Sequence, residues 1–520
     1  MKKYFLIHPL FFVLIPVLAL YNTNKEWLYF NELFLPLTLV LVLALLLGLF
    51  FRFFSKDWSK IALITTAFLI LFSFFGYLND IFLLIVKIFN LSHIKHLDYF
   101  LSLAFFILIV FVLFYLVFDS KKAFQNLNKY LFIFGLLVSL SFVIELGYYF
   151  YNQETVNFNG EETIYLSEQE ESLNSSYPDI YYLVFDAHAR SDILQQLYDY
   201  NDQEFVNFLE EKGFFVAKDS HSNYPQTHLS MSSTLNLDYL DKVLVDKIDK
   251  EESDRTMLRP FLENSRVYRI LDKYNYATVS LPPSWGGIAR IKSDVVVSAD
   301  KSLSDFNRIF LQSTPFKILL STSHAVDIYK SALFSALKVI PEVSAISDST
   351  FIYAHVMSPH PPFLFDENGN IKKDFNLIGK DGNHYFKVGG TLEEYKQGYA
   401  DQVQFIDKKI EQVVSDILVK YPEGTQQPII IIQSDHGSGM QTNWESLENT
   451  NLEERLAILN AYYVPEELKN KLYDSITPVN TFRLLFNHLF DQDFELLEDK
   501  LYFATWEQPF NFINVTDSLK

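Results

Sequence analysis

The stretch PIIIIQSDHGSG, residues 428–439, decides the fold of the larger part of this chain. Its run of four isoleucines is typical of a strand that is buried on both faces, as in a parallel sheet. The strand delivers Asp435 and His436, followed by a glycine, to its carboxyl end. Packing alone does not explain an adjacent carboxylate and imidazole there, so the pair indicates a functional site.

Four more apolar runs are predicted to be buried strands: 179–185, 213–217, 277–281 and 350–356. They alternate with stretches of helical pattern at 191–212, 261–275 and 391–420. This alternation predicts an α/β domain with a mostly parallel sheet flanked by helices. In such domains, ligands bind beyond the carboxyl ends of the strands.

Metal-binding residue types follow two further strands. Asp186 comes directly after 179–185, and His360 follows 350–356 by a few residues. Together with Asp435 and His436 they predict a pocket for a divalent metal ion. Asp186 alone could equally be a helix cap or a turn residue. We expect His355 to face the core or to support the loop.

The first 151 residues are predicted to be a membrane domain. Five apolar segments without a polar stripe are long enough, or nearly so, to cross a bilayer. They lie at 4–21, 32–51, 61–78, 99–118 and 130–150, and the stretch 81–89 is too short to cross alone. The acidic stretch 152–177 is interpreted as a linker, and 178–520 as the catalytic domain.

Lysines and arginines cluster before the first segment and after the second and fourth. The positive-inside rule therefore places the N-terminus in the cytoplasm, and five crossings place the catalytic domain outside, at the plasma (bacterial inner) membrane. The spans either anchor the enzyme only or also help to hold a lipid-linked substrate. Glu145, near the end of the last span, does not decide between these.

Composition excludes several functions. The chain carries a net charge of −20, of which residues 1–151 contribute +4 and residues 152–520 contribute −24. An acidic domain repels nucleic-acid phosphates, so we expect no nucleic acid as a partner. The chain has no cysteine, which excludes disulfides, thiolate metal sites and a cysteine nucleophile.

Three stretches together resemble the sulfatase-like branch of the alkaline-phosphatase superfamily, and within it the lipoteichoic acid synthases (phosphoglycerol transferases) and phosphoethanolamine transferases. They are DIYYLVFDAHARSD (179–192), SNYPQTHLSMSSTLN (222–236) and IIIIQSDHGSG (429–439). The resemblance covers about residues 178–440, and the five-span anchor matches the same architecture.

The resemblance implies an alkaline-phosphatase-like fold with one divalent metal ion (Mn, Mg or Zn) and a role for each motif residue. Asp186, Asp435 and His436 would be metal ligands, and Thr227 would be both a ligand and the nucleophile. His360 would bind the substrate or leaving group. Arg190 would be a phosphate contact or would form an ordinary ion pair, and His188 and His228 could join the site.

The chain departs from parts of the family pattern. The run Thr227–Met231 lacks the proline and arginine of the sulfatase motif, so sulfate ester hydrolysis is not expected. Two-metal relatives carry a further D-x-x-x-H motif, and here DQVQFID (401–407) offers Asp401 and Asp407 without a histidine. We therefore expect a single metal ion and a surface helix over 401–407.

Three functions remain open from the sequence. The first is a transferase that moves phosphoglycerol or phosphoethanolamine from a membrane lipid to a surface glycan or lipid, because a membrane anchor concentrates lipid donors. The second is a phosphodiesterase, phosphatase or sulfatase-like hydrolase with the same site. The third is a module that binds a surface polymer without catalysis.

Overall fold

The computed structural model describes residues 6–519 apart from 26–27, 29, 92–93, 95, 122–123, 156–176, 245–248, 283–292, 298–304, 320–321, 346–348 and 374. The chain forms two compact units. The first comprises Met1–Ile164 and Ser302–Asp327, and the second comprises Tyr165–Lys301 and Ile328–Lys520. The predicted catalytic domain 178–520 is therefore interrupted, because residues 302–327 belong to the first unit. Most of the predicted linker lies outside the described residues.

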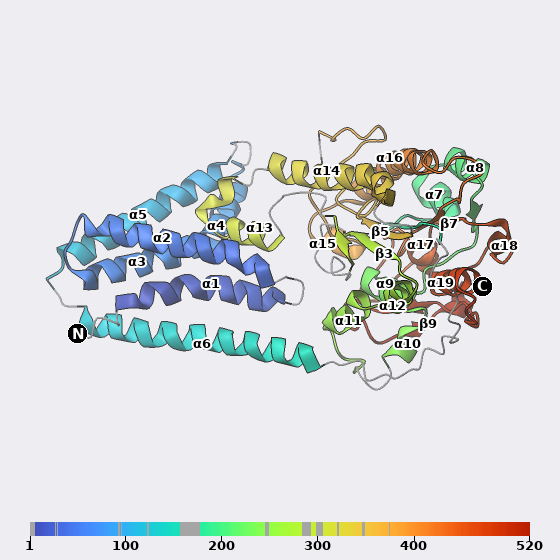
Figure 1. The fold of residues 1–520 in the computed structure, drawn as a ribbon. Helices are drawn as coiled ribbons and strands as arrows, with labels where there is room; N and C mark the ends of the chain where they lie inside the picture. Colours follow the sequence, from blue (N-terminus) through green and yellow to red (C-terminus); the bar gives the residue numbers. More distant parts are fainter. Residues whose placement is uncertain are drawn as a thin grey trace. The chain divides into compact units, whose positions relative to one another are not determined.

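The first unit is built from apolar helices (Figure 1). They are α1 (His8–Asn24), α2 (Phe34–Arg52), α3 (Trp58–Ser73), α4 (Phe75–Ile88), α5 (Leu97–Asp119) and α6 (Gln125–Thr155), with the short turn η3 (Phe30–Leu33) before α2. Three described helical segments are long and apolar enough to span a bilayer: Phe30–Arg52, Leu97–Asp119 and Gln125–Phe150. Helices α3 and α4 meet at a bend of 52° and count as a fourth only as one broken span. The prediction of five spans and of their direction remains a prediction.

A later part of the chain completes this unit. Helix α13 (Asp305–Gln312) and the 3-10 turn η5 (Pro315–Leu319) pack on the N-terminal helices, and α14 (Thr322–Val339) begins here. The buried core joins Val17 and Tyr21 of α1 and Val40 of α2 to Phe306 and Phe310 of α13.

The second unit contains a seven-stranded sheet in the order β2-β7-β6-β1-β5-β3-β4. The strands are β1 (Ile180–Phe185), β2 (Phe215–Val216), β3 (Ala277–Leu281), β4 (Val295–Val296), β5 (Thr350–Val356), β6 (Ile429–Gln433) and β7 (Asn460–Tyr463). Strands β6, β1, β5, β3 and β4 pair in parallel, and β7 runs antiparallel to both of its neighbours. The predicted fold class, apolar helices followed by an α/β unit with a mostly parallel sheet, is confirmed.

Helices cover the sheet and complete the unit. They are α7 (Ser191–Tyr198), α8 (Gln203–Glu211), α9 (Thr227–Asn236), α10 (Leu240–Val243), α11 (Arg259–Glu263), α12 (Arg266–Lys273), α15 (Asn383–Lys387), α16 (Leu392–Leu418), α17 (Leu452–Leu456), α18 (Glu466–Lys469) and α19 (Pro478–Leu489). The unit also contains the turns η4 (Arg255–Leu258), η6 (Ile340–Ala345) and η7 (Thr516–Ser518) and the antiparallel pair β8 (Tyr502–Phe503) and β9 (Ile513–Asn514). The predicted helix 191–212 is two helices, because Asp199 ends α7 in the left-handed conformation.

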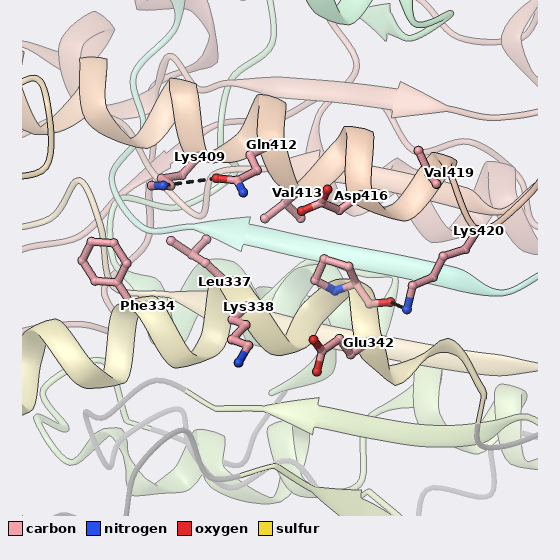
Figure 2. Close-up of a pocket in the computed structure, with 11 residues that line it drawn as sticks. Phe334, Leu337, Lys338, Glu342, Lys409, Gln412, Val413, Asp416, Val419 and Lys420 are labelled. Atoms are coloured by element: carbon pink, nitrogen blue, oxygen red, sulfur yellow. Dashed lines mark hydrogen bonds between the residues drawn. The ribbon is translucent and has the colours of Figure 1, made fainter.

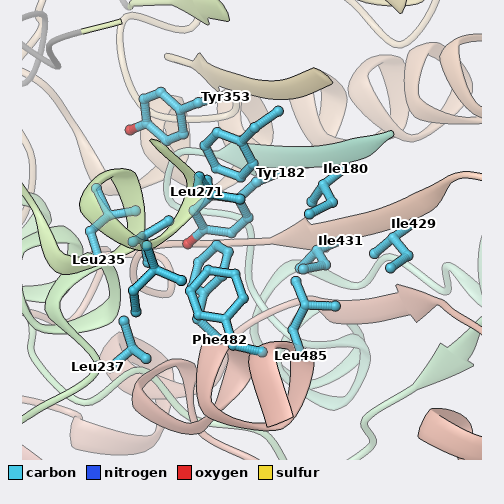
Figure 3. Close-up of a cluster of buried hydrophobic side chains, with 14 of the residues drawn as sticks. Ile180, Tyr182, Leu235, Leu237, Leu271, Tyr353, Ile429, Ile431, Phe482 and Leu485 are labelled. Carbon is cyan, nitrogen blue, oxygen red and sulfur yellow. The ribbon is translucent and has the colours of Figure 1, made fainter. Parts of the chain in front are cut away.

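The main core lies on one face of the sheet. Tyr182 of β1 and Ile431 of β6 meet Phe482 and Leu485 of α19 there, together with residues of α9 and α12 (Figure 3). Alternate residues of β1, such as Leu183, point to the other face and are buried as well. A central strand buried on both faces has a fixed register, so the position of its last residue is fixed too.

Candidate metal centre

The carboxyl ends of β1 and β6 lie side by side because these two strands pair directly. Ile180 is opposite Ile429 and Val184 is opposite Gln433. Asp186 follows β1 by one residue, and Asp435 and His436 follow β6 by two and three. The sheet register therefore brings the three side chains to one place, as predicted.

Asp186, Asp435 and His436 form a compact, buried group. One ligand atom from each lies within 4.8 Å of the others. His436 Nε2 lies 3.6 Å from Asp186 Oδ1 and 3.4 Å from Asp435 Oδ2. Among the described residues, no hydrogen-bond donor meets either of these two carboxylate oxygens. Burying a carboxylate oxygen without a hydrogen-bond donor costs folding free energy, and a bound divalent cation would offset that cost.

Thr227, at the start of helix α9, also belongs to this group. It is the first residue of α9, and its Oγ1 lies 3.2 Å from His436 Nε2. His436 Nδ1 lies 2.9 Å from Gly437 O and donates to it as the N–H nitrogen, so Nε2 carries the lone pair. Two carboxylates, one imidazole and one hydroxyl thus converge, a donor set that fits Mn²⁺, Mg²⁺ or Zn²⁺.

Electrostatics keep these groups in their metal-binding forms. Burial alone would raise the pKa of the Asp186 carboxyl, but the side chains of His360, His355 and His436 hold it below its ordinary value. Burial and the Arg455 guanidinium lower the pKa of the His436 imidazole. At neutral pH the site therefore offers a carboxylate and a neutral imidazole, the protonation states that coordinate a cation.

The turn after β1 is strained at Ala187, whose φ is 65°. This left-handed conformation is uncommon for a residue with a Cβ. It directs the Ala187 amide to Asp435 Oδ1, at 3.2 Å. The amide fixes one oxygen of Asp435 and leaves the other for the centre of the group.

The two histidines near β5 have different surroundings. His355 accompanies Asp186, with Nε2 3.2 Å from Asp186 Oδ2 and Nδ1 3.0 Å from the Tyr353 hydroxyl. This is the supporting role expected for it. His360 is half-buried, its ring centroid lies 6.4 Å from that of His436, and its Nδ1 is held by Pro361 O at 2.7 Å. Its Nε2 makes no hydrogen bond to the part of the chain that the structure describes.

Arg190 forms ion pairs away from the centre. Its guanidinium donates to Asp192, at 2.7 Å from Nε, and to Glu453, at 2.6 Å from Nη2. It also donates to Ser220 O at 3.2 Å. Of the two alternatives for this residue, the ordinary ion pair is the one found.

The segment 401–407 is not a surface element, which corrects the prediction. Asp401 and Asp407 are both buried. Asp401 pairs with Lys372, and Asp407 lies 2.7 Å from His188 Nε2. Although burial alone would lower the pKa of His188, the Asp407 carboxylate raises it. Because its Nδ1 faces Ala189 O at 3.0 Å and its Nε2 faces Asp407, His188 supplies no lone pair to a metal. His228 is buried in the first turn of α9 and is not part of the metal-binding group.

A buried arginine that the sequence analysis did not predict connects the segment before Thr227 to the loop that carries His436. Arg455 of α17 donates from Nε to Pro225 O at 2.8 Å, two residues before Thr227, and from Nη1 to Gly437 O at 3.3 Å. The same Nη1 lies 2.5 Å from Asp381 Oδ2. Burial alone would raise the pKa of Asp381, but Arg455, His360 and His436 lower it to about 2. Neither residue stands in a motif, so the sequence carries no signal for them.

A pocket of about 440 Å³ does not include the candidate metal centre (Figure 2). It is lined by residues of α14, η6 and α16, among them Phe334, Leu337, Lys338, Glu342 and Asp416. None of the predicted site residues lines it. The candidate metal centre is the compact group of donor atoms at the ends of β1 and β6.

No protein-family model and no curated protein matches the chain. Solved structures match at low identity. The C-terminal periplasmic domain of EcEptC from Escherichia coli in complex with Zn is 11% identical, with 66% of this chain and 94% of that chain covered and a TM-score of 0.42. The integral membrane protein lipooligosaccharide phosphoethanolamine transferase A (EptA) from Neisseria meningitidis is 12% identical, with 74% and 75% covered and a TM-score of 0.40. The phosphonate monoester hydrolase of Agrobacterium radiobacter is 10% identical, with 63% and 80% covered and a TM-score of 0.39. These values assign neither a family nor an activity to the chain.

Proposed function

We propose that this protein is a membrane-anchored, metal-dependent phospho-group transferase of the alkaline-phosphatase type. It would move phosphoglycerol or phosphoethanolamine from a membrane lipid to a surface glycan or lipid at the outer membrane face. One observation carries the proposal: Thr227 Oγ1 lies 3.2 Å from His436 Nε2, in a group with two buried carboxylate oxygens that lack donors.

Asp186, Asp435, His436 and Thr227 are the residues that would hold the metal ion. A bound divalent cation would act as a Lewis acid that lowers the pKa of the threonine hydroxyl and offsets charge on the phosphoryl oxygens. The start of α9 adds the positive end of a helix dipole beside the same hydroxyl, which favours an anionic phosphate.

The reaction would proceed in two displacements at phosphorus. Thr227 Oγ1, which would have lost its proton to solvent when the cation bound, attacks phosphorus; the Oγ1–P bond forms, and the bond from phosphorus to the oxygen of the donor alcohol breaks. The half-buried His360, whose Nε2 is not bonded to any described residue, would supply the proton that the departing alkoxide needs. An acceptor hydroxyl then attacks the phosphothreonine, its proton returns to His360, and Thr227 is released.

The test uses the full chain in lipid nanodiscs, stripped of metal and then supplied with Mn²⁺, Zn²⁺ or Mg²⁺. An activated aryl phosphodiester should be turned over only with metal, and Thr227→Ala should lose at least about a thousandfold in rate. After denaturation during turnover, mass spectrometry should find the phospho group on the peptide that contains Thr227.

Thr234→Ala is the matched control. Thr234 is buried on the same helix, and its Oγ1 donates to Ser230 O within α9 at 2.9 Å, so its loss should leave turnover near the wild-type rate. Equal rates for Thr227→Ala and Thr234→Ala would exclude Thr227 as the nucleophile. The metal content of the purified protein, measured by mass spectrometry, should fall in Asp435→Asn. This measurement needs no substrate, so it tests the metal site even if the true donor lipid is not known.

A hydrolase with the same site is the second candidate. It would use water as the acceptor, so free alcohol and phosphate would appear from the lipid donor without any glycan or acceptor lipid. Donor turnover that requires an acceptor hydroxyl favours the transferase.

A further inference from the structure

Residues 305–319 of the catalytic part of the sequence are built into the helical unit. They come more than 150 residues after the last predicted span, and the sequence placed them in the domain outside the membrane. The structure groups them with the N-terminal helices instead. Figure 1 shows α13 among those helices, near α4.

Helix α13 is docked through an apolar face. Phe306 and Phe310, four residues apart, are buried in the core that α1 and α2 form. The Phe306 ring meets that of Tyr21 edge-on, with centroids 5.6 Å apart. Two buried aromatic side chains at this spacing fix one side of a helix of eight residues.

The turn after α13 is held in place by hydrogen bonds that its backbone carbonyls accept from the helical unit. The Gly76 amide donates to Ser313 O at 2.8 Å, and the Tyr99 hydroxyl donates to Pro315 O at 3.0 Å. A Cβ at Gly76 would lie 2.9 Å from Ser313 Cα, so this close approach requires glycine at the bend between α3 and α4. The Phe316 ring packs against Phe72, with centroids 5.5 Å apart.

Three apolar side chains of this segment remain partly exposed. Ile309 is 41% exposed, and Phe316 and Ile318 are each 39% exposed. Phe74 and Tyr77, which lie close to Gly76 in the chain, are exposed as well. Lys317 lies between Phe316 and Ile318 in the chain, and a long basic side chain of this kind can reach from an apolar surface to lipid headgroups.

We propose that residues 305–319 are a second membrane attachment of the catalytic unit, with Ile309, Phe316 and Ile318 in contact with the acyl chains of the leaflet at which α3 ends. The partner is lipid, because the exposed side chains are apolar and the segment packs on α3 and α4, which together are apolar enough to cross a bilayer as one broken span. The proposal does not depend on the proposed catalytic function.

The chain has no cysteine, so single cysteines report on single positions. Spin labels at Ile309→Cys, Phe316→Cys and Ile318→Cys in the full chain, in nanodiscs, would be measured for collision with oxygen and with a water-soluble nickel chelate. Phe111→Cys on α5 is the lipid reference, because Phe111 is 65% exposed on a spanning helix. Val419→Cys in the catalytic unit, at 79% exposed, is the aqueous reference.

We expect the labels at 309, 316 and 318 to collide with oxygen as the Phe111→Cys label does, and with the nickel chelate at least fivefold less than the Val419→Cys label. Collision values equal to those of Val419→Cys would overturn the proposal, since the segment would face water. Protection from both reagents would also overturn it, since protein and not lipid would then cover the segment.

A second variant separates docking from exposure. Gly76→Leu should displace residues 312–313 and move the label at 316 toward the aqueous reference. Gly48→Leu is its control, because a Cβ there meets nothing within 4 Å. An unchanged label in Gly76→Leu would contradict the docking that the proposal requires.

Discussion

Arg455 contacts the backbone on both sides of the candidate metal centre, beside Thr227 and beside His436. Its guanidinium holds Pro225 O and Gly437 O, which flank Thr227 and His436 in sequence, and it neutralises Asp381. Breaking a buried ion pair by removing one partner is costly, because the other charge remains buried without compensation.

We predict that Arg455→Met lowers the free energy of unfolding by about 3–5 kcal/mol, and that the double variant Arg455→Met/Asp381→Leu recovers a large part of it. Thermal unfolding followed by tryptophan fluorescence measures both, since the Trp444 ring lies 4.7 Å from the Arg455 guanidinium. A double variant no more stable than Arg455→Met would show that the Asp381 charge is not the cause.

The ion pair between Arg455 and Asp381 also makes the free energy of unfolding depend on pH. The pKa of Asp381 falls from 3.8 to about 2 in the folded protein, so its contribution is complete above about pH 4 and is lost as the pH falls toward 2. The shift corresponds to about 2 kcal/mol. In Asp381→Asn the free energy of unfolding should therefore fall less between pH 4 and pH 2 than in the wild type.

At the scale of elements, the loop after β6 is fixed by the close approach of two backbones. A Cβ at Gly437 would lie 2.2 Å from Glu454 O and 2.7 Å from Ala457 O, and the Gly437 amide donates to Arg455 O at 2.7 Å. The backbone of α17 and of the residue after it leaves no space for a side chain at Gly437, so this position requires glycine.

We predict that Gly437→Ala shifts His436 and lowers turnover on the order of 100-fold, since small displacements of catalytic groups have effects of that size. Metal affinity, measured by titration of the purified chain, should fall as well. Gly379→Ala is the control, because the nearest atom to its Cβ is Pro362 Cδ at 4.0 Å. Equal metal affinity in the two variants would show that the loop adapts to the added methyl group.

The strands and the metal group could be predicted from sequence because both follow local rules. Apolar runs located β1, β3, β5 and β6 to within about one residue, and the residues after two of them supplied the predicted ligands. Strand β7 was missed because its sequence, NAYY, has no apolar run and depends on β6 for its place. The burial of Asp407 was missed because its partner, His188, is 219 residues away in the chain.

At the scale of the whole molecule, the direction of the chain across the membrane is the prediction most in need of a test. Basic residues after α2 predict that the loop around Ser55 is cytoplasmic and that the catalytic unit is outside. On intact cells, a membrane-impermeant maleimide should label Val419→Cys, and it should label Ser55→Cys only after lysis. The reverse pattern would place the catalytic unit in the cytoplasm and remove surface glycans from the list of acceptors.

The interruption of the catalytic unit by residues 302–327 also sets the order in which a nascent chain can assemble. Strand β5 lies between β1 and β3 in the sheet, yet it is synthesised after both and after α13 and η5. Before β5 emerges, β1 and β3 have no common neighbour, and β6 brings Asp435 and His436 later still. The segment that packs on the membrane helices is therefore complete before the centre of the sheet can close. Asp435 and His436 can therefore join Asp186 only after the segment that packs on the N-terminal helices has been synthesised.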